Sequence, residues 1–177
     1  MVKKSIIDEL QNMVDYKCFT PTDVAIGNTI RSSLFLKEKF NNGIFQRLKS
    51  RLVAGGDWEW VNNNTNLYSP TVYPITYNTI IQDATNRDLI MEVFDVKSAY
   101  LNAELKDKDI TMILDKLLAS EYIKLVPNAS VFLQQDGSMY VKINKAIYGL
   151  KESALLWYQR ITKFLLKYIN FITKLLY

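Results

Sequence analysis

An aspartate that directly follows a short apolar run is the residue of this chain best placed to do chemistry. Residues 91–94 have the β-branched and aromatic character of a buried strand, and Asp95 comes next. Because a strand fixes the backbone, a carboxylate at its carboxyl end can present its oxygens to a divalent cation. An aspartate in such a place also commonly caps a helix or opens a turn. The local pattern leaves both interpretations open.

The composition excludes several other kinds of site. The chain contains no histidine and a single cysteine, Cys18. These counts remove the commonest zinc ligand and the commonest general base near neutral pH. Metallohydrolase sites, Ser-His-Asp and Cys-His catalysis, cysteine-rich zinc sites and internal disulfides are therefore excluded. With 177 residues, 49% of them hydrophobic, the chain is long enough for one domain with a substantial core.

Positive charge is concentrated in one region of the chain. The net charge of +4 is too small to indicate nucleic-acid binding by itself. Between Arg31 and Arg51, however, six basic residues face one acid, so this region carries +5 and the rest of the chain sums to −1. Such a surface suits phosphate groups, although a merely solvated charged face has the same composition.

The first half of the chain predicts a helix followed by a hairpin. Ser5, with Asp8 three residues later, is typical of a helix start. Pro21 requires the helix to end before it and leaves residues 17–30 as an irregular connection. Residues 41–43 (Asn-Asn-Gly) predict a hairpin turn, because these residue types tolerate positive φ angles. Alternation on the second strand places five side chains on one face: Phe45, Arg47, Lys49, Arg51 and Val53.

Helices and strands are interleaved in the rest of the chain. Polar residues 57–66 predict a loop, and Pro74 begins a predicted helix that fades near Asn86 and packs beneath the strand of Asp95. Four more elements are predicted, a strand over residues 110–114, a helix that Asp115 caps and that runs through Tyr122, a strand over 139–143 and a helix over about 153–169. The apolar stripe of the last helix is expected to face the core. Without regular βαβ spacing, this order predicts a single-domain α+β fold.

Four blocks of the sequence, in order, resemble the reverse transcriptases of Ty1/copia-type retrotransposons. Asp95–Asn102 resembles the first polymerase motif of that family. The other three blocks are Ser50–Gly56, Tyr68–Val72, and Lys145–Ser153 followed by Trp157 and Tyr158. The resemblance extends over nearly the whole chain. It implies a right-hand polymerase fold and one incomplete reverse transcriptase domain over residues 1–177. Residues 1–90 would form an N-terminal helix and fingers, and residues 91–177 a partial palm with fingers elements.

The resemblance implies an RNA-directed DNA polymerase that copies an RNA template onto a DNA primer from deoxynucleoside triphosphates. Such enzymes use two Mg²⁺ ions roughly 4 Å apart, held by several carboxylates. Asp95 matches one catalytic metal ligand. The family's other two lie in a hairpin with an Asp-Asp pair, and this sequence contains no such pair. Polymerisation by these residues alone is therefore not expected. Asp107 and Asp109 are predicted to lie in a solvated turn instead.

The resemblance also assigns residues to the incoming nucleotide. Lys49 and Arg51 match the fingers cations that contact the triphosphate, and the forked guanidinium of arginine suits phosphate oxygens. Val96 and Tyr100 match the nucleotide pocket. The ring of Tyr100 would clash with a ribose 2′-hydroxyl and so select deoxynucleotides.

The last block is expected to line the incoming base and the template strand. Tyr148 and Gly149 match this part of the family pattern, where glycine permits a close backbone approach. The sequence departs from the pattern at Glu152, where the family usually has glutamine, and at Ala154, where proline is common. A negative charge beside a groove for phosphates is mildly unfavourable for template binding.

Two alternatives differ in class from a polymerase fragment. One is a non-catalytic remnant that binds nucleic acid through the basic region, and the other is a transposon relic without a biochemical role. An intracellular protein, cytoplasmic or nuclear and without a membrane partner, is expected. Lys3 and Lys4 do not lead into a signal-peptide core, and lysines interrupt the apolar tail.

Overall fold

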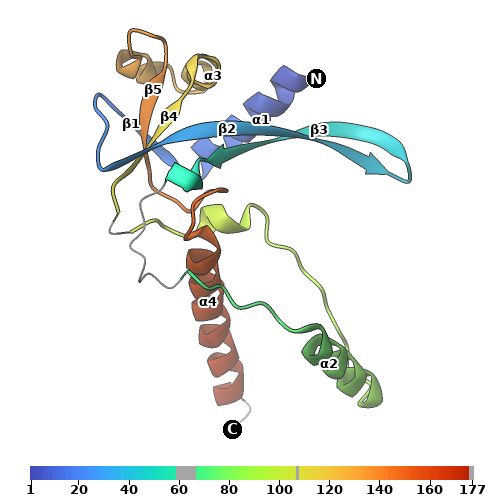
Figure 1. The fold of residues 1–177 in the computed structure, drawn as a ribbon. Coiled ribbons are helices and arrows are strands. Elements are labelled where there is room, and N and C mark those ends of the chain that lie inside the picture. The colour runs from blue at the N-terminus through green and yellow to red at the C-terminus, as the bar shows by residue number, and fades with distance from the viewer. Residues whose placement is uncertain (59–66, 107, 176–177) are drawn as a thin grey trace.

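A five-stranded sheet forms the centre of the molecule, in the order β1-β5-β4-β2-β3 (Figure 1). The computed structural model describes residues 1–58, 67–106 and 108–175. The strands are Phe19–Thr22 (β1), Asn28–Asn41 (β2), Ile44–Ala54 (β3), Ile110–Leu114 (β4) and Met139–Ile143 (β5). Only the β2–β4 pair is parallel among these strands, and the other neighbours are antiparallel. The mixture of helices and sheet agrees with the predicted α+β class.

The described part of the chain contains four α-helices, Val2–Asp15 (α1), Pro74–Asn86 (α2), Lys116–Leu125 (α3) and Ser153–Leu175 (α4). Three short 3₁₀ helices span Gly56–Trp58, Ala99–Asn102 and Pro127–Phe132. α1 and α3 contact each other and pack against the sheet. The core between them is contiguous, and its fully buried members include Leu10, Met13, Leu52, Met112, Leu118 and Val141.

The long hairpin of β2 and β3 turns at Asn42 and Gly43, as predicted, and both residues have positive φ angles. Figure 1 shows it reaching away from the rest of the sheet. The pairing register shifts between Lys39 and Phe40, so that Phe40 pairs with Phe45 while Lys39 pairs with Arg47. Since successive residues of β2 point to opposite faces, Phe45 leaves the face of Arg47. The prediction that Phe45 shares this face was wrong.

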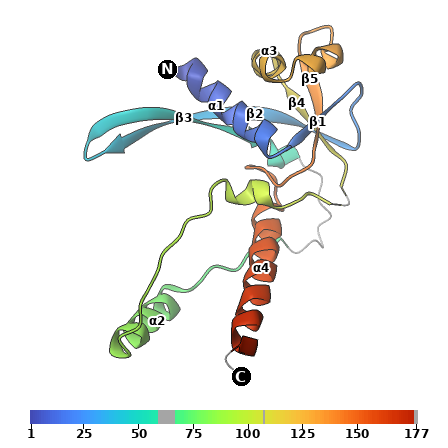
Figure 2. The ribbon, with the colours of Figure 1, turned by 180° about the vertical axis from the view of Figure 1, so that it is seen from behind.

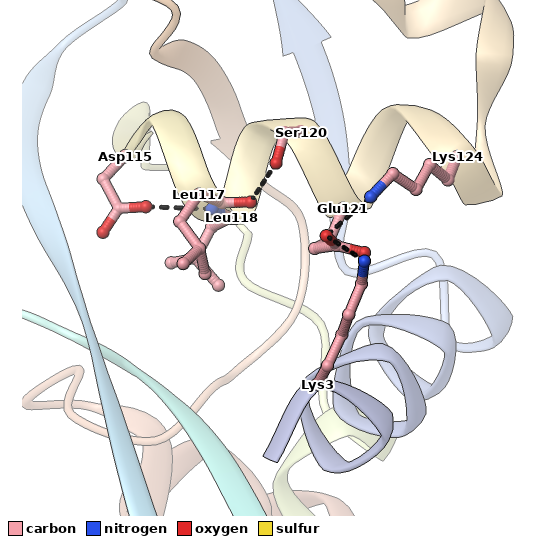
Figure 3. A network of polar contacts seen from close by, with 7 residues as sticks. All are labelled: Lys3, Asp115, Leu117, Leu118, Ser120, Glu121 and Lys124. Carbon is pink, nitrogen blue, oxygen red and sulfur yellow. Dashed lines mark hydrogen bonds and ion pairs between the residues drawn. The ribbon is translucent and has the colours of Figure 1, made fainter. Parts of the chain in front are cut away.

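Asp115 caps α3, as the sequence predicted. A side-chain oxygen of Asp115 accepts a hydrogen bond of 2.9 Å from the backbone N–H of Leu118 (Figure 3). This bond satisfies one of the four N–H groups that the first turn leaves without a helical partner. α3 runs on to Leu125, three residues beyond the predicted end.

The N-terminal segment differs from its prediction in two ways. α1 begins at Val2, so Ser5 lies inside the helix and is buried rather than acting as its N-cap. Residues 17–30 are not irregular, because they contain β1 and the start of β2. β1 finds its partner in β5, more than a hundred residues later, a pairing that local sequence does not reveal. Most of the predicted loop 57–66, and Asp107, lie outside the described residues.

The predicted buried strand before Asp95 does not form. Residues 89–96 have no regular secondary structure, and the side chains of Val93 and Phe94 are 97% and 75% exposed. α2 begins at Pro74 as predicted, but it lies away from the sheet and only Ala84 is buried (Figure 1). The prediction that α2 packs beneath the strand of Asp95 was therefore wrong. An apolar run favours a buried strand only where another strand lies beside it.

The last helix, α4, is longer than predicted and leads away from the sheet (Figure 2). Ser153 is its one buried residue among those up to residue 168, and farther along the apolar stripe Leu165 is 38% and Tyr168 52% exposed. The expectation that this stripe faces the core was wrong for the helix beyond its first turns. Its first turns contact the 3₁₀ helix of residues 99–102.

Candidate active site

A cleft of about 550 Å³ lies where α1, β3 and the segment after Asp95 meet. Five of the predicted site residues line it, Lys49, Arg51, Asp95, Tyr100 and Tyr148. They come from three parts of the chain, residues 49–51, residues 95–100 and residue 148, and more than forty residues separate each part from the next. The fold therefore brings together the predicted cations, the predicted metal ligand and two aromatic rings. Val96 is partly exposed and does not line this cleft.

At the cleft, the ring of Tyr148 contacts both the ring of Tyr100 and the guanidinium of Arg51. The ring centroids of Tyr100 and Tyr148 are 5.1 Å apart, with an interplanar angle of 53°. The guanidinium carbon of Arg51 lies over the Tyr148 ring, 5.1 Å from its centroid. A cation held over an aromatic face is attracted by the ring quadrupole, which orients the side chain without using its N–H donors. Arg51 is thus oriented while its donors stay available to an anion.

Backbone contacts hold Tyr148 beside the end of β3. The carbonyl of Tyr148 accepts a hydrogen bond of 2.8 Å from the N–H of Ala54. Gly149 follows with φ +93°, and a Cβ on it would lie 2.0 Å from the carbonyl oxygen of Ala54. Only glycine fits this conformation and this approach. In the structure Gly149 lies against the backbone of β3, and its approach to the incoming base and template strand stays a prediction.

Asp95 is exposed and its side chain reaches the cleft from an irregular segment. Three residues later, Ser98 has a left-handed backbone with φ +50°. The side-chain amide of Asn102 donates to the carbonyls of Lys97, Ser98 and Ala99, and so closes the turn after Asp95. A local hydrogen-bonded turn, rather than a strand, positions this carboxylate.

The carboxylates of the described residues do not form a complete site for a metal ion. No group of three or more histidine, cysteine, aspartate or glutamate side chains in this part of the chain could hold one. Mg²⁺ is commonly bound by one or two carboxylates together with substrate phosphates and water. Asp95, exposed at a cleft that also contains Lys49 and Arg51, fits one ligand of such an ion.

The opposite wall of the cleft was not predicted. It is formed by α1, whose residues Asp8, Glu9, Asn12 and Asp15 line it. Glu9 is the most enclosed of these acids, and burial raises its pKa above the ordinary value, against the opposing effects of its hydrogen bond to Leu52 and of Lys49 and Arg51. Polar residues beside the apolar stripe of α1 were visible in the sequence, but they did not indicate which element they would meet.

A second groove, of about 480 Å³, lies along the hairpin and shares Lys49, Arg51 and Tyr148 with the cleft. Its lining includes Gly149, Arg51 and Lys49 together with Lys37 and Lys39 of β2. Lys37 pairs directly with Lys49, and Lys39 pairs with Arg47. Like charges directly opposite each other destabilise a strand pair, and a bound anion would relieve that repulsion. Lys37, Lys39, Arg47, Lys49 and Arg51, five of the six basic residues of the predicted region, therefore share one face of the hairpin.

Two other sequence blocks also lie close together. The hydroxyl of Ser69 donates to the carbonyl of Ala154 at 3.2 Å, which joins the block Tyr68–Val72 to the start of α4. Glu152 forms an ion pair of 2.5 Å with Lys108, and its side chain is only 14% exposed. The charge that departs from the family pattern is thus neutralised by a partner.

Within the described residues, no helix is long and apolar enough to cross a membrane.

Comparison with known proteins identifies the family of this chain. The model of the reverse transcriptase (RNA-dependent DNA polymerase) family matches residues 20–175. The truncated transposon Ty1-A Gag-Pol polyprotein of Saccharomyces cerevisiae is 27% identical over 137 residues, which are 77% of this chain and 10% of that protein. The transposon Ty1-LR2 Gag-Pol polyprotein of the same yeast is 26% identical over 77% of this chain and 7% of its own length.

The chain therefore spans a tenth or less of the length of these curated relatives. No solved structure matches the chain significantly. The family match covers all four sequence blocks and every predicted site residue. This chain belongs to the reverse transcriptase (RNA-dependent DNA polymerase) family.

Proposed function

We propose that these residues form the nucleotide-binding part of an RNA-directed DNA polymerase, namely the fingers and part of the palm of a right-hand polymerase. The observation that carries the proposal is the cleft in which Arg51, Asp95, Tyr100 and Tyr148 meet. An arginine fork, a carboxylate and an aromatic ring are the groups that a triphosphate, its metal ion and its sugar require. The surrounding sequence blocks agree with those of the family.

Each predicted residue has a role in this proposal. Lys49 and Arg51 bind the triphosphate, with Arg51 oriented by its contact with Tyr148. Tyr100 closes the sugar pocket and excludes a 2′-hydroxyl. The family pattern assigns Val96 to the same pocket, although Val96 does not line the cleft. Tyr148 and Gly149 line the incoming base and the template. The template is RNA, the primer is DNA and the substrates are deoxynucleoside triphosphates.

Asp95 would hold Mg²⁺ together with the triphosphate. When bound, Mg²⁺ activates the primer 3′-hydroxyl and neutralises charge on the triphosphate. One carboxylate is too few for two ions, and the sequence has no Asp-Asp pair to supply the others. We therefore propose that this chain binds nucleotide but does not polymerise alone.

Calorimetric titration of the full chain with dATP and Mg²⁺ tests the proposal. Arg51→Ala should weaken dATP binding about tenfold, because a charge-assisted hydrogen bond to phosphate is lost. Arg160→Ala is the matched control, since Arg160 is exposed on α4 away from the cleft and its replacement should change nothing. Equal affinity of wild type and Arg51→Ala would contradict the nucleotide role. Primer extension that is abolished by Asp95→Ala would contradict the proposed inactivity.

The basic face of the hairpin favours a second candidate, a non-catalytic module that binds nucleic acid. Its evidence is the pairing of Lys37 with Lys49 and of Lys39 with Arg47 in the hairpin. Lys37, Lys39 and Lys49 also line one groove. This candidate predicts salt-sensitive binding of an RNA–DNA duplex, weakened by Lys37→Ala and Lys39→Ala, with no dATP affinity. Each lost phosphate contact should reduce the slope of log affinity against log salt by about one. A relic without function would bind neither ligand.

A further inference from the structure

Four side chains form a polar stripe along α1 and its C-cap residue, defined here as Ser5, Glu9, Asn12 and Tyr16, of which Tyr16 is the C-cap. They are spaced by four, three and four residues. At about 100° per residue, this spacing confines them to a sector of roughly 60° on the helix surface. The stripe runs beside the apolar positions Ile6, Leu10 and Met13, which face the core. α1 lies outside the residues that match the family model, which begin at residue 20.

Ser5 and Glu9, the first half of the stripe, form hydrogen bonds with the edge of β3 that has no neighbouring strand. β3 has β2 on one side only, so alternate N–H groups on its other side lack a strand to bond. The hydroxyl of Ser5 accepts from the N–H of Ser50 at 2.7 Å and donates to the carbonyl of Leu48 at 3.1 Å. A carboxylate oxygen of Glu9 accepts from the N–H of Leu52 at 3.1 Å.

The spacing of these bonds explains why one helix can serve the strand. Residues four apart on a helix are separated by about 6 Å along its axis, and residues two apart on a strand by about 6.6 Å. Ser5 and Glu9 therefore match Ser50 and Leu52. Lys49 directly precedes Ser50, and Arg51 lies between Ser50 and Leu52. Because side chains alternate along a strand, those of Lys49 and Arg51 point to the face of β3 opposite to the side chains of Ser50 and Leu52, and they line the cleft.

The second half of the stripe holds the segment after Asp95. The side chains of Asn12 and Ser98 exchange two hydrogen bonds of 3.2 Å. The hydroxyl of Tyr16 donates to the carbonyl of Lys97 at 3.5 Å. Ser98 has a positive φ, which a residue other than glycine adopts at a cost unless its surroundings hold it there. The paired bonds to Asn12 are such a constraint.

We propose that the polar stripe of α1 is the positioning device of the cleft, which sets the fingers cations of β3 at a fixed place relative to Asp95. One rigid helix contacts both parts, so neither part can shift without breaking hydrogen bonds to the stripe. This inference rests on the proposed nucleotide role of Lys49 and Arg51. Glu9 is a positioning residue that acts through Arg51 and does not contact the nucleotide.

Titration with dATP and Mg²⁺ also tests this inference. Glu9→Leu removes the acceptor for the N–H of Leu52, and we expect it to weaken dATP binding about tenfold. Glu9→Gln keeps an oxygen acceptor and should restore most of the affinity. Asn12→Ala should weaken binding to a similar extent through Ser98. Asp115→Ala is the control, since it removes a helix cap away from the cleft and should lower only the melting temperature.

A double-variant cycle separates positioning from general destabilisation. If Glu9 acts through Arg51, the double variant Glu9→Leu with Arg51→Ala should bind dATP no more weakly than Arg51→Ala alone. Additive losses would overturn the inference, as would wild-type affinity of Glu9→Leu while Arg51→Ala is weakened. If Arg51→Ala itself binds as wild type does, the proposed nucleotide role fails, and the positioning role fails with it.

Discussion

Gly149 is the residue on which the geometry of the cleft most directly depends. It turns the chain at φ +93° directly after Tyr148, whose ring contacts both Arg51 and Tyr100. Any side chain at this position would meet the backbone of Ala54. The cleft therefore depends on one backbone conformation as much as on its charged groups.

We expect Gly149→Ala to lower the free energy of unfolding by more than about 3 kcal/mol, because positive φ and a collision with the carbonyl of Ala54 act together. Gly43→Ala is the matched control. Gly43 also has positive φ, +77°, but a Cβ there would meet nothing within 4 Å, so only about 1–2 kcal/mol should be lost. Urea denaturation measures both values. Similar losses for the two variants would contradict the close approach.

At the scale of elements, α1 and α3 are held together by a charged side chain at their contact. A carboxylate oxygen of Glu121 lies 2.6 Å from the ammonium of Lys124 and 3.6 Å from that of Lys3 on α1 (Figure 3). The side chain of Glu121 is only 10% exposed, and its second oxygen has no hydrogen-bond partner among the described residues. The hydrogen bond with Lys124 contributes most to a pKa of Glu121 below its ordinary value, and Lys3 adds to it.

This lowered pKa has a defined effect on stability. A carboxyl whose folded-state pKa is depressed stabilises the fold above its unfolded pKa, and the contribution is lost as the pH falls through the folded pKa. Glu121→Gln should therefore lower the melting temperature near neutral pH, and the difference from wild type should vanish in acid below the ordinary carboxyl range. Lys124→Met should show the same dependence. A difference that stays constant with pH would contradict an ionic origin.

At the scale of the whole molecule, one part of the chain has little contact with the core. α2 and the segment before Asp95 lie away from the sheet (Figure 2). Their exposed apolar side chains are Ile75, Tyr77, Ile80, Ile90, Val93 and Phe94. Many exposed apolar side chains in one part of a molecule promote association in solution.

We expect the purified chain to self-associate as its concentration rises, and the double variant Val93→Ser, Phe94→Ser to remain monomeric at higher concentration. Val131→Ser is the control, because Val131 is 75% exposed on a different part of the surface and should not change association. Light scattering coupled to size-exclusion chromatography measures the mass. A monomeric wild type at all concentrations would contradict the prediction.

Short-range features could be predicted from the sequence because their causes lie within a few residues. The hairpin turn at Asn42-Gly43, the Asp115 cap and the start of α2 at Pro74 each depend on backbone preferences of the residues themselves. The family blocks also identified Arg51 and Tyr148, which the fold brings into contact. Their roles remain predictions.

Only the tertiary structure decided what each element packs against. Residues 91–94 have the composition of a buried strand but stay exposed, since no strand in the described chain pairs with them. Ser5 has the pattern of an N-cap but instead bonds the edge of β3. Burial and edge hydrogen bonds join residues that are distant in sequence, so no local pattern contains them. By itself the sequence determined the hairpin turn, the Asp115 cap and the chemical groups of the site, and the packing of α1 against β3 decided where those groups meet.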